Sequence, residues 1–558
     1  MMHLDIGLSA IRAAQQGLFT VSNNIANANT AGYHRQRVEL VDRPPSVAGG
    51  LNVGSGVQVA GITRLTDLAA EVSLTGVASL QGESQATLDV LRQIETALLP
   101  TDGSLMSAVT EFFNRMEQLG AQPSERTIRD SVVAAGEEVL QQLDQLNTRF
   151  NQLRQDQGVL IEEEVVSINE TAANIATLNQ QIRVDRQQGG EPNTLLDQRD
   201  RLISELASRV DVFSQSLVTA GSPILAAAGW LVIGEQATQL STETAENGSI
   251  ALTSSLGQGT VVPASGRLAG MLESQRMINT FQDALHDWAS VFVNEIDRIQ
   301  SSGLGQREQT SLISGTRSIA NSSDPLGSVG VPFPLDAGTV SVSITNTVSG
   351  TRNTTDIPFD PAVDSLNDLL GRLNAIAELS ATYDAGSGTV TLQTTAGHTM
   401  DFVRADGAAD QTGLLAALGI HSFFTGNADT GFGIDPEIQN SSLRIAVSRT
   451  GAVGDSNHVE RYVDLRQRAL FADGQETLEQ RLISLTTATA YRIEAEESSL
   501  EYLQNQEVHL GNARDAVSGV DPNEELIQML EYQRMFQAAS RFVTSVDETL
   551  DELFRLVG

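Results

Sequence analysis

Residues 521–557 read DPNEELIQMLEYQRMFQAASRFVTSVDETLDELFRLV. Asp521, Pro522 and Glu524 predict a helix start, because Asp caps an N-terminus, Pro suits the first helical position and Glu at the third resembles a capping box. Apolar residues then recur in steps of three and four at Met529, Tyr532, Phe536, Ala539, Val543, Val546, Leu550, Leu553 and Val557. At the 40% hydrophobic content of the chain, nine such positions in a row arise by chance with a probability of about 3 × 10⁻⁴. The stretch therefore predicts a long helix with one narrow coiled-coil stripe.

The first 28 residues carry a second stripe of the same spacing. Its members are Leu4, Gly7, Ile11, Ala14, Leu18, Val21, Ile25 and Ala28. The run stops at residues 29–32, where Asn or Gly can adopt the left-handed conformation that ends a helix. Because a narrow stripe cannot be buried by its own helix, we expect the two terminal helices to pair as a coiled coil. The net charges of residues 1–43 (+1) and 518–558 (−5) favour this pairing.

Two such helices are marginally stable in water by themselves. We therefore expect the terminal arms to be disordered or frayed in the free monomer and to order when many copies pack together. Light proteolysis of monomer and assembly tests this expectation, which fails if the arms resist equally in both.

An asparagine cluster ends the first helix: Asn23, Asn24, Asn27 and Asn29. These residues could simply be polar groups on the wet side of a helix. Asparagine is a poor helix former, however, and its amide can both donate and accept hydrogen bonds. We expect at least one of them to bond a neighbouring copy. The predicted assembly interface consists of Leu4, Ile11, Leu18, Asn23, Asn24, Ile25, Asn27, Met529, Tyr532, Phe536, Val543, Val546, Leu550 and Leu553.

Composition excludes several classes of function. The 558 residues suit three or four folding units. A net charge of −35 argues against a nucleic-acid partner and against an anionic membrane surface. The chain has no cysteine and no lysine, because all 35 basic residues are arginine. Thiolate, zinc-knuckle and Schiff-base chemistry are thus excluded, and we expect no enzyme activity, no cofactor and no catalytic, cofactor-binding or metal-binding residues.

The centre of the chain is expected to be a helical bundle with inserted strands, which gives a mainly α fold with small β-rich domains. Helical spacing dominates from about residue 64 to 186, and the step of eight from Leu153 to Ile161 predicts local unwinding. Four parts follow. Residues 1–63 with 515–558 form the terminal coiled coil, and 64–209 with 263–320 and 437–514 form the bundle. Residues 210–262 form a small β segment, and 321–436 an inserted outer β-rich domain.

The two ends also resemble a known family. Residues 8–18 and 22–36 closely resemble the N-terminal signature of the bacterial flagellar axial family, which comprises rod, hook and hook-associated proteins; Ala31 stands where most members have proline. Residues 518–521, 532–533 and 553–554 resemble the C-terminal signature. Four internal runs resemble hook-associated members: residues 108–114 with 122–126, 192–200, 266–272 and 518–520.

The resemblance implies a structural protein of the hook–filament junction that self-assembles into a ring or helical array. It implies secretion through the flagellar type III export channel to the extracellular flagellum. Further implied partners are the hook protein, the second junction protein and an export chaperone on the C-terminal helix; no nucleic acid and no membrane are expected. The alternatives are another axial protein (the second junction protein or the hook protein) or an axial protein with an inserted cell-wall hydrolase or adhesive domain.

Overall fold

The computed structural model describes residues 2–48, 51–98, 103–214, 225–226, 230–245, 248–255, 260–305, 310–329, 331, 333–404, 410–427, 431–450 and 454–557. The chain divides into two compact units, which are treated separately below. Unit 1 comprises Met1–Leu91, Arg154–Arg276 and Ile493–Gly558, and unit 2 comprises Arg92–Leu153 and Met277–Arg492. The four-part division expected from the sequence stays a prediction.

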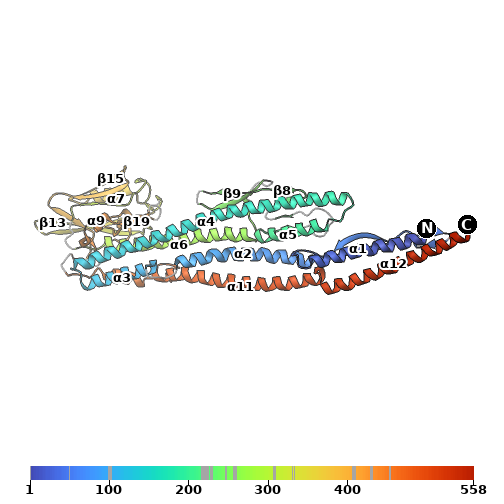
Figure 1. The fold of residues 1–558 in the computed structure, drawn as a ribbon. Coiled ribbons are helices and arrows are strands. Elements are labelled where there is room, and N and C mark those ends of the chain that lie inside the picture. Colours follow the sequence, from blue (N-terminus) through green and yellow to red (C-terminus); the bar gives the residue numbers. More distant parts are fainter. Residues whose placement is uncertain are drawn as a thin grey trace. The chain divides into compact units, whose positions relative to one another are not determined.

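In unit 1 the two terminal helices lie side by side, as the matching stripes predict. Helix α1 (Met2–Asn27) and helix α12 (Pro522–Val557) are antiparallel, with both chain ends at the same end of the pair (Figure 1). Glycines of α1 let α12 approach closely: a Cβ atom on Gly7 would lie 2.5 Å from Cγ2 of Val543, and one on Gly17 2.5 Å from Cδ1 of Tyr532. The expected coiled-coil pairing is confirmed.

A β-hairpin covers a second side of α1. Strand β4 (Val57–Arg64) pairs antiparallel with β1 (Gln36–Asp42), and β2 (Ser46–Ala48) pairs with β3 (Leu51–Val53). The Val57 N–H donates to Oγ of Ser9 at 3.2 Å. Helix α1 therefore buries Ser9, Ala13 and Thr20 in addition to stripe residues such as Ala14.

The rest of unit 1 is built from helices and two small antiparallel sheets. It contains α5 (Asn193–Arg209) and parts of α2 (Leu68–Leu98), α4 (Arg126–Gln187), α6 (Arg267–Ser301) and α11 (Leu478–Ser518). The sheets are β5 (Phe213–Ser214), β6 (Leu225–Ala226), β7 (Trp230–Ile233) and β8 (Gln236–Ala237), and β9 (Leu240–Thr244), β10 (Ile250–Ser254) and β11 (Thr260–Val261). Apolar residues of α4, such as Ile168, form a core with Leu240 and Leu252.

Helix α4 corrects one expectation. The step of eight between Leu153 and Ile161 was expected to unwind the helix locally, yet α4 is helical without interruption from Arg126 to Gln187. Gln157 is buried halfway between the two apolar residues. Two steps of four therefore continue the buried stripe, and a buried polar residue concealed this continuity in the sequence.

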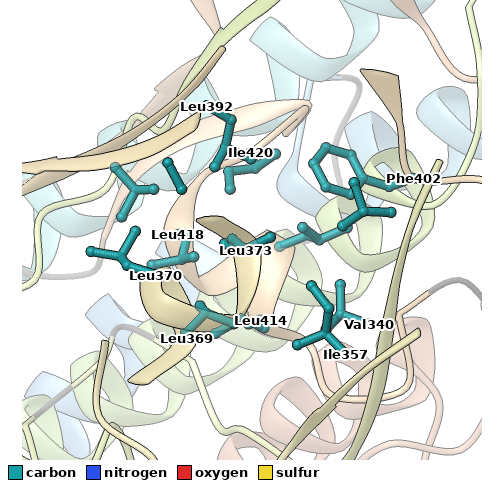
Figure 2. Packing of buried hydrophobic residues seen from close by; sticks show 14 of the residues in the cluster. Val340, Ile357, Leu369, Leu370, Leu373, Leu392, Phe402, Leu414, Leu418 and Ile420 are labelled. Carbon is teal, nitrogen blue, oxygen red and sulfur yellow. The ribbon is translucent and has the colours of Figure 1, made fainter. Parts of the chain in front are cut away.

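Unit 2 contains the inserted β-rich domain and further helices. The inserted part consists of two three-stranded antiparallel sheets, in the orders β14-β13-β17 and β12-β16-β15. Their strands are β12 (Leu312–Ser314), β13 (Gly338–Asn346), β14 (Arg352–Phe359), β15 (Leu379–Asp384), β16 (Thr389–Thr394) and β17 (His398–Asp401). Helix α7 (Leu366–Asn374) begins with a Ser365–Asp368 capping box and supplies Leu369 and Leu373 to the core (Figure 2). The expected β-rich insertion is therefore present.

Short elements join these sheets to the helices of unit 2. They are α3 (Leu105–Ala121), α8 (Leu414–Leu418), β18 (Phe424–Asn427), β19 (Gly431–Ile434), α9 (Pro436–Asn440), a 3₁₀ turn (Ser442–Arg444) and α10 (Glu460–Gln467). The buried guanidinium of Arg317 pairs with the buried carboxylate of Asp297 at 2.6 Å, and Asp297 also accepts the N–H groups of Phe423 and Phe424. The mainly α fold with inserted β segments is confirmed.

The close approach at Gly17 predicts the effect of a substitution. In Gly17→Val the new side chain occupies the position of the Tyr532 ring, and overpacking of this kind costs about 1–3 kcal/mol. Amide hydrogen exchange in α1 and α12 should become faster. Gly76→Val is the matched control, because nothing lies within 4 Å of a Cβ atom there. Equal exchange rates in the two variants would contradict the packing of α1 on α12.

Candidate assembly interface

The predicted interface residues meet along the α1–α12 pair, but the pair covers them only in part. Ala14 and Val21 of α1 and Ala539 of α12 are buried. The other apolar members with described side chains are half-buried: Leu4, Ile11, Leu18, Ile25, Met529, Tyr532, Phe536, Val543, Val546 and Leu550. Leu553 lies in α12, and its side chain is outside the described part. Two helices and one hairpin thus leave much of both stripes accessible.

Further apolar side chains beside the stripes are exposed to solvent. Phe19 of α1 is 73% exposed and Ile527 of α12 is 60% exposed, and Leu8, Leu526, Leu530 and Phe542 are exposed as well. The heptad pattern did not predict these six residues, because they lie beside the stripe. Large exposed apolar patches on proteins are typical of interaction surfaces. A single copy therefore leaves several large apolar side chains exposed on its terminal helices.

Asn24 corrects the expectation for the asparagine cluster. Its side chain is fully buried, and its amide nitrogen donates to the Gln36 carbonyl and to Oε2 of Glu525, both at 2.9 Å. Its oxygen accepts the Tyr33 hydroxyl at 2.8 Å and the Gln36 N–H at 3.0 Å. These four bonds use the whole capacity of the amide, so Asn24 joins parts of one chain and has no bond left for a neighbouring copy.

The other asparagines remain accessible. Asn23 and Asn29 are exposed and Asn27 is half-buried. Asn27 donates to the Asn23 carbonyl at 2.9 Å, which is a local bond within the helix. The hydrogen bond to a neighbouring copy stays a prediction for Asn23, Asn27 and Asn29.

An ion pair fixes the start of α12 against the chain after α1. Arg35 binds the buried Glu525 through Nε at 2.6 Å and the exposed Glu524 through Nη1 at 2.8 Å. The backbone N–H of Arg35 donates to the Ser518 carbonyl at 2.9 Å. Asp521 caps the helix as expected by accepting the Asn523 N–H. Glu524 was expected to act as the capping-box residue. Its carboxylate instead forms an ion pair with the oppositely charged Arg35.

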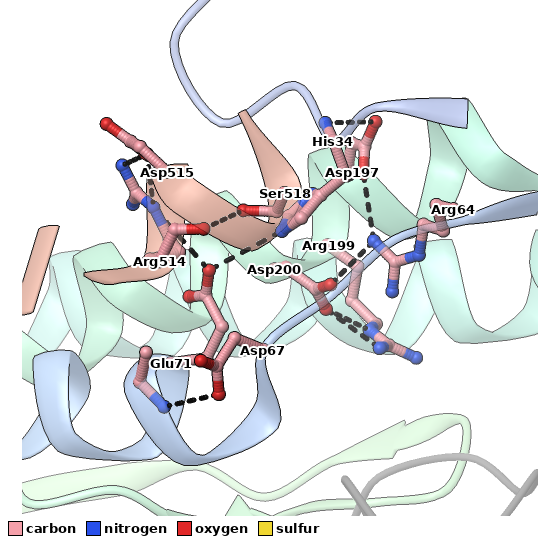
Figure 3. A network of polar contacts seen from close by, with 11 residues as sticks. His34, Arg64, Asp67, Glu71, Asp197, Arg199, Asp200, Arg514, Asp515 and Ser518 are labelled. Atoms are coloured by element: carbon pink, nitrogen blue, oxygen red, sulfur yellow. Dashed lines mark hydrogen bonds and ion pairs between the residues drawn. The ribbon is translucent and has the colours of Figure 1, made fainter. Parts of the chain in front are cut away.

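A second network ties the same segment to the helices of unit 1 (Figure 3). Nδ1 of the buried His34 lies 2.8 Å from Oδ1 of Asp197, and Nε2 lies 3.4 Å from Oε1 of Glu71. Arg64 of β4 binds both Asp197 and Asp200 at 2.8 Å. The run Asp197–Asp200 was noticed in the sequence only as a resemblance. The structure gives it a physical role, which is to hold the segment leading out of α1 on helix α5.

The carboxylates decide the charge of His34. Burial lowers the pKa of His34, but the hydrogen bonds that its ring donates to the carboxylates of Asp197 and Glu71 outweigh burial and raise the pKa to about 9. His34 is therefore a cation at neutral pH and can donate from both ring nitrogens. The pKa of Tyr33 rises to about 12 through burial and the nearby charges of Asp197 and Glu525, so its hydroxyl stays a donor to Asn24.

The raised pKa of His34 predicts a pH dependence of stability. Because the folded-state value is above the unfolded value of about 6.5, the His34 contribution is fully present below pH 6.5 and is lost as the pH rises through about 9. The loss is on the order of 3 kcal/mol. We expect urea unfolding at pH 6 and pH 9.5 to show this loss in the wild type and little of it in His34→Gln. His509→Gln, at an exposed position, is the control, and the same pH slope in His34→Gln as in the wild type would contradict the assignment.

The two glutamates around Arg35 allow a matched comparison. Glu525→Gln removes the charge from a fully buried carboxylate, whereas Glu524→Gln removes it from one that is 61% exposed. Charge-assisted buried bonds contribute about 1.5–3 kcal/mol and exposed pairs about 0–1 kcal/mol. Thermal unfolding should show a clearly lower Tm for Glu525→Gln only. An equal fall in Tm for the two variants would contradict the conclusion that the buried Arg35–Glu525 bond is the stronger one.

Within the described residues, no helix is long and apolar enough to cross a membrane, and no group of three His, Asp or Glu side chains is placed to hold a metal ion.

Three family models match the chain. Residues 91–312 match the helical domain of flagellar hook-associated protein FlgK, residues 4–34 match the flagella basal body rod protein, and residues 515–556 match the C-terminal region of the flagellar basal body rod FlgEFG proteins. Among solved structures, the flagellar hook junction protein FlgK from Burkholderia pseudomallei is similar with a TM-score of 0.49 and 14% identity, over 80% of this chain and 100% of that one.

Curated relatives extend over the whole chain. Flagellar hook-associated protein 1 of Bacillus subtilis is 24% identical over 100% of this chain and 98% of its own length, and that of Escherichia coli is 24% identical over 99% of both. The protein of the same name from Salmonella typhimurium is 31% identical over 38% of each chain. The helical region and both ends thus match flagellar models, and over its whole length the chain is similar to flagellar hook-associated protein 1 (FlgK).

Proposed function

We propose that this chain is a structural protein of the bacterial flagellum that forms the junction between hook and filament and self-assembles through its terminal helices. The observation that carries the proposal is the half-covered α1–α12 pair. Its stripes meet each other as a coiled coil requires, yet Phe19, Ile527 and their apolar neighbours stay exposed in a single copy. Neighbouring copies packed around the pair would bury them, and this burial would drive assembly.

The similarity to full-length relatives named hook-associated protein 1 favours this function over that of the hook protein and that of the second junction protein. The family is one of flagellar structural proteins, which supports a role without catalysis.

The finer partners belong to the same proposal. The chain would contact the hook protein on one side and the second junction protein on the other, and an export chaperone would bind the C-terminal helix before assembly. The half-buried stripe of α12 gives a chaperone an apolar surface to hold. Export through the flagellar channel to the cell exterior suits a chain without cysteine, since no disulfide has to form or break on the way.

A charge in the α12 stripe tests the function. Val543 faces Gly7 of α1, so Val543→Asp places a carboxylate between the helices, where an unpaired charge is strongly unfavourable. Electron microscopy of cells should show hooks without filaments, and swimming should stop. Thr544→Asp changes the next residue, which lies on the exposed side, and should keep both the filaments and swimming. Measuring the protein in the culture medium separates failed export from failed assembly, and normal filaments with Val543→Asp would contradict the proposal.

A further inference from the structure

A buried polar cluster attaches the inserted β-rich domain of unit 2 to helix α6. Asp297 of α6 accepts the N–H groups of Phe423 and Phe424 at 2.8 and 2.9 Å. Arg317 of the inserted part forms the ion pair with Asp297 at 2.6 Å and also donates to the Phe424 carbonyl at 3.1 Å. The Phe423 carbonyl in turn accepts the N–H of Asp435 at 2.9 Å. We call these five residues the joint, and they bring two carboxyl groups to the start of the β18–β19 hairpin.

The charges of the joint do not balance. Asp297, Arg317 and Asp435 are 0%, 4% and 3% exposed, so two carboxyl groups and one guanidinium are shielded from water. Arg317 and two N–H groups compensate the charge of Asp297, whereas the side chain of Asp435 accepts the N–H of Glu437 at 2.8 Å. Loss of water and a second carboxylate nearby both favour the protonated form of a carboxyl group. Asp435 is therefore the position at which a proton removes the surplus negative charge.

The acidities of the two carboxyl groups agree with this assignment. Burial raises the pKa of Asp435 to about 6; the Glu437 N–H lowers it, and the charges of Glu437 and Asp297 raise it further. Burial also raises the pKa of Asp297, against the opposing effects of Arg317 and of the two backbone N–H groups. Because the two groups interact, the proton belongs to the pair, and the weaker compensation of Asp435 places it there.

Two further ionisable groups lie close to Asp435. His421 and Arg444 line the same small cavity as Asp435 and Glu437. Arg444 forms an ion pair with Glu437, so these two charges offset each other. Burial, together with the charge of Arg444, lowers the pKa of His421 to about 4, and His421 is therefore mostly neutral from pH 5 upwards. Neither His421 nor Arg444 changes its charge near pH 6, whereas Asp435 does.

The joint docks the inserted domain on the helices of unit 2. The rings of Phe423 and Phe112 of α3 have centroids 5.8 Å apart, and those of Phe424 and Phe292 of α6 are 5.7 Å apart. Asp435 directly follows β19 and caps α9. An ionised Asp435 regains water only if β19 and α9 move away from α6, because a buried carboxylate without a partner is strongly unfavourable. Ionisation of Asp435 thus opposes docking, and protonation favours it.

We propose that the joint is a proton-controlled attachment, in which a protonated Asp435 holds the inserted β-rich domain against α6 and an ionised Asp435 lets this attachment open more readily. The direction follows from linkage. The folded-state pKa of Asp435 is above the unfolded value of about 3.9, so its stabilising contribution is fully present below pH 3.9 and is lost as the pH rises through about 6. The joint is thus tightest in acid and opens more readily in neutral and alkaline solution.

Cysteine labelling of the full chain tests the proposal. The chain has no cysteine, and Ile438→Cys places a single thiol at a buried position of α9, where it reacts when the joint opens. Labelling rates are measured from pH 5 to pH 8 with Asp435 and with Asp435→Asn, which still caps α9 but cannot ionise. Dividing the first rate by the second at each pH removes the pH dependence of the thiol itself. This ratio should rise about tenfold between pH 5 and pH 8.

Asp521→Asn is the matched control. Asp521 also caps a helix and accepts the Asn523 N–H at 2.8 Å, but it is exposed. With Asp521→Asn, labelling at position 438 should keep the pH dependence measured with Asp435 unchanged. A ratio that is constant or falls from pH 5 to pH 8 overturns the proposal. If Ile438→Cys does not fold, Ile434→Cys at a buried position of β19 takes its place, and the same rise in the ratio is required.

Discussion

Each terminal helix has an apolar stripe that is too narrow to be buried by the helix itself. Among the described residues, helix α12 packs chiefly on α1, and α1 packs on the β1–β4 hairpin on another side. Each helix therefore buries its stripe against the other. At Gly7 and Gly17 of α1 the side chains of α12 come close to the backbone. Everything else about the ends of the chain depends on this pairing. It brings residues 1–64 and 515–558 together, and it makes the surface of one copy incomplete.

Buried charges set the position of the pair. Glu525 is fully buried between Arg35 and Asn24, and His34 lies between Asp197 and Glu71. Apolar stripes slide past one another at low energetic cost, whereas a displaced ion pair leaves a buried charge without its partner, which is strongly unfavourable. We interpret the polar contacts as the elements that fix the register of α12 and hold the pair on α5. The apolar stripe supplies the attraction, and the ion pairs select one arrangement.

The sequence predicted what depends on local spacing. The heptad steps predicted both terminal helices and their pairing, and helical spacing predicted the long helices between residues 64 and 186. It could not predict contacts between groups far apart in the chain. His34 and Asp197 are separated by 163 residues and Arg35 and Glu525 by 490, and no periodicity links such pairs. The bond of Asn24 to Glu525, 501 residues away, was missed for the same reason, and no periodicity marks its bonds to Tyr33 and Gln36.

Distance measurement by electron spin resonance tests the central claim most directly. The chain has no cysteine, so spin labels can be placed at Arg12→Cys and Gln537→Cys alone, both exposed positions on facing turns of α1 and α12. Labelled copies are diluted with unlabelled ones and assembled. Helices packed 8–10 Å apart predict one narrow distribution centred at about 20 Å once the label arms are included. A broad distribution without a peak near this distance would contradict the account.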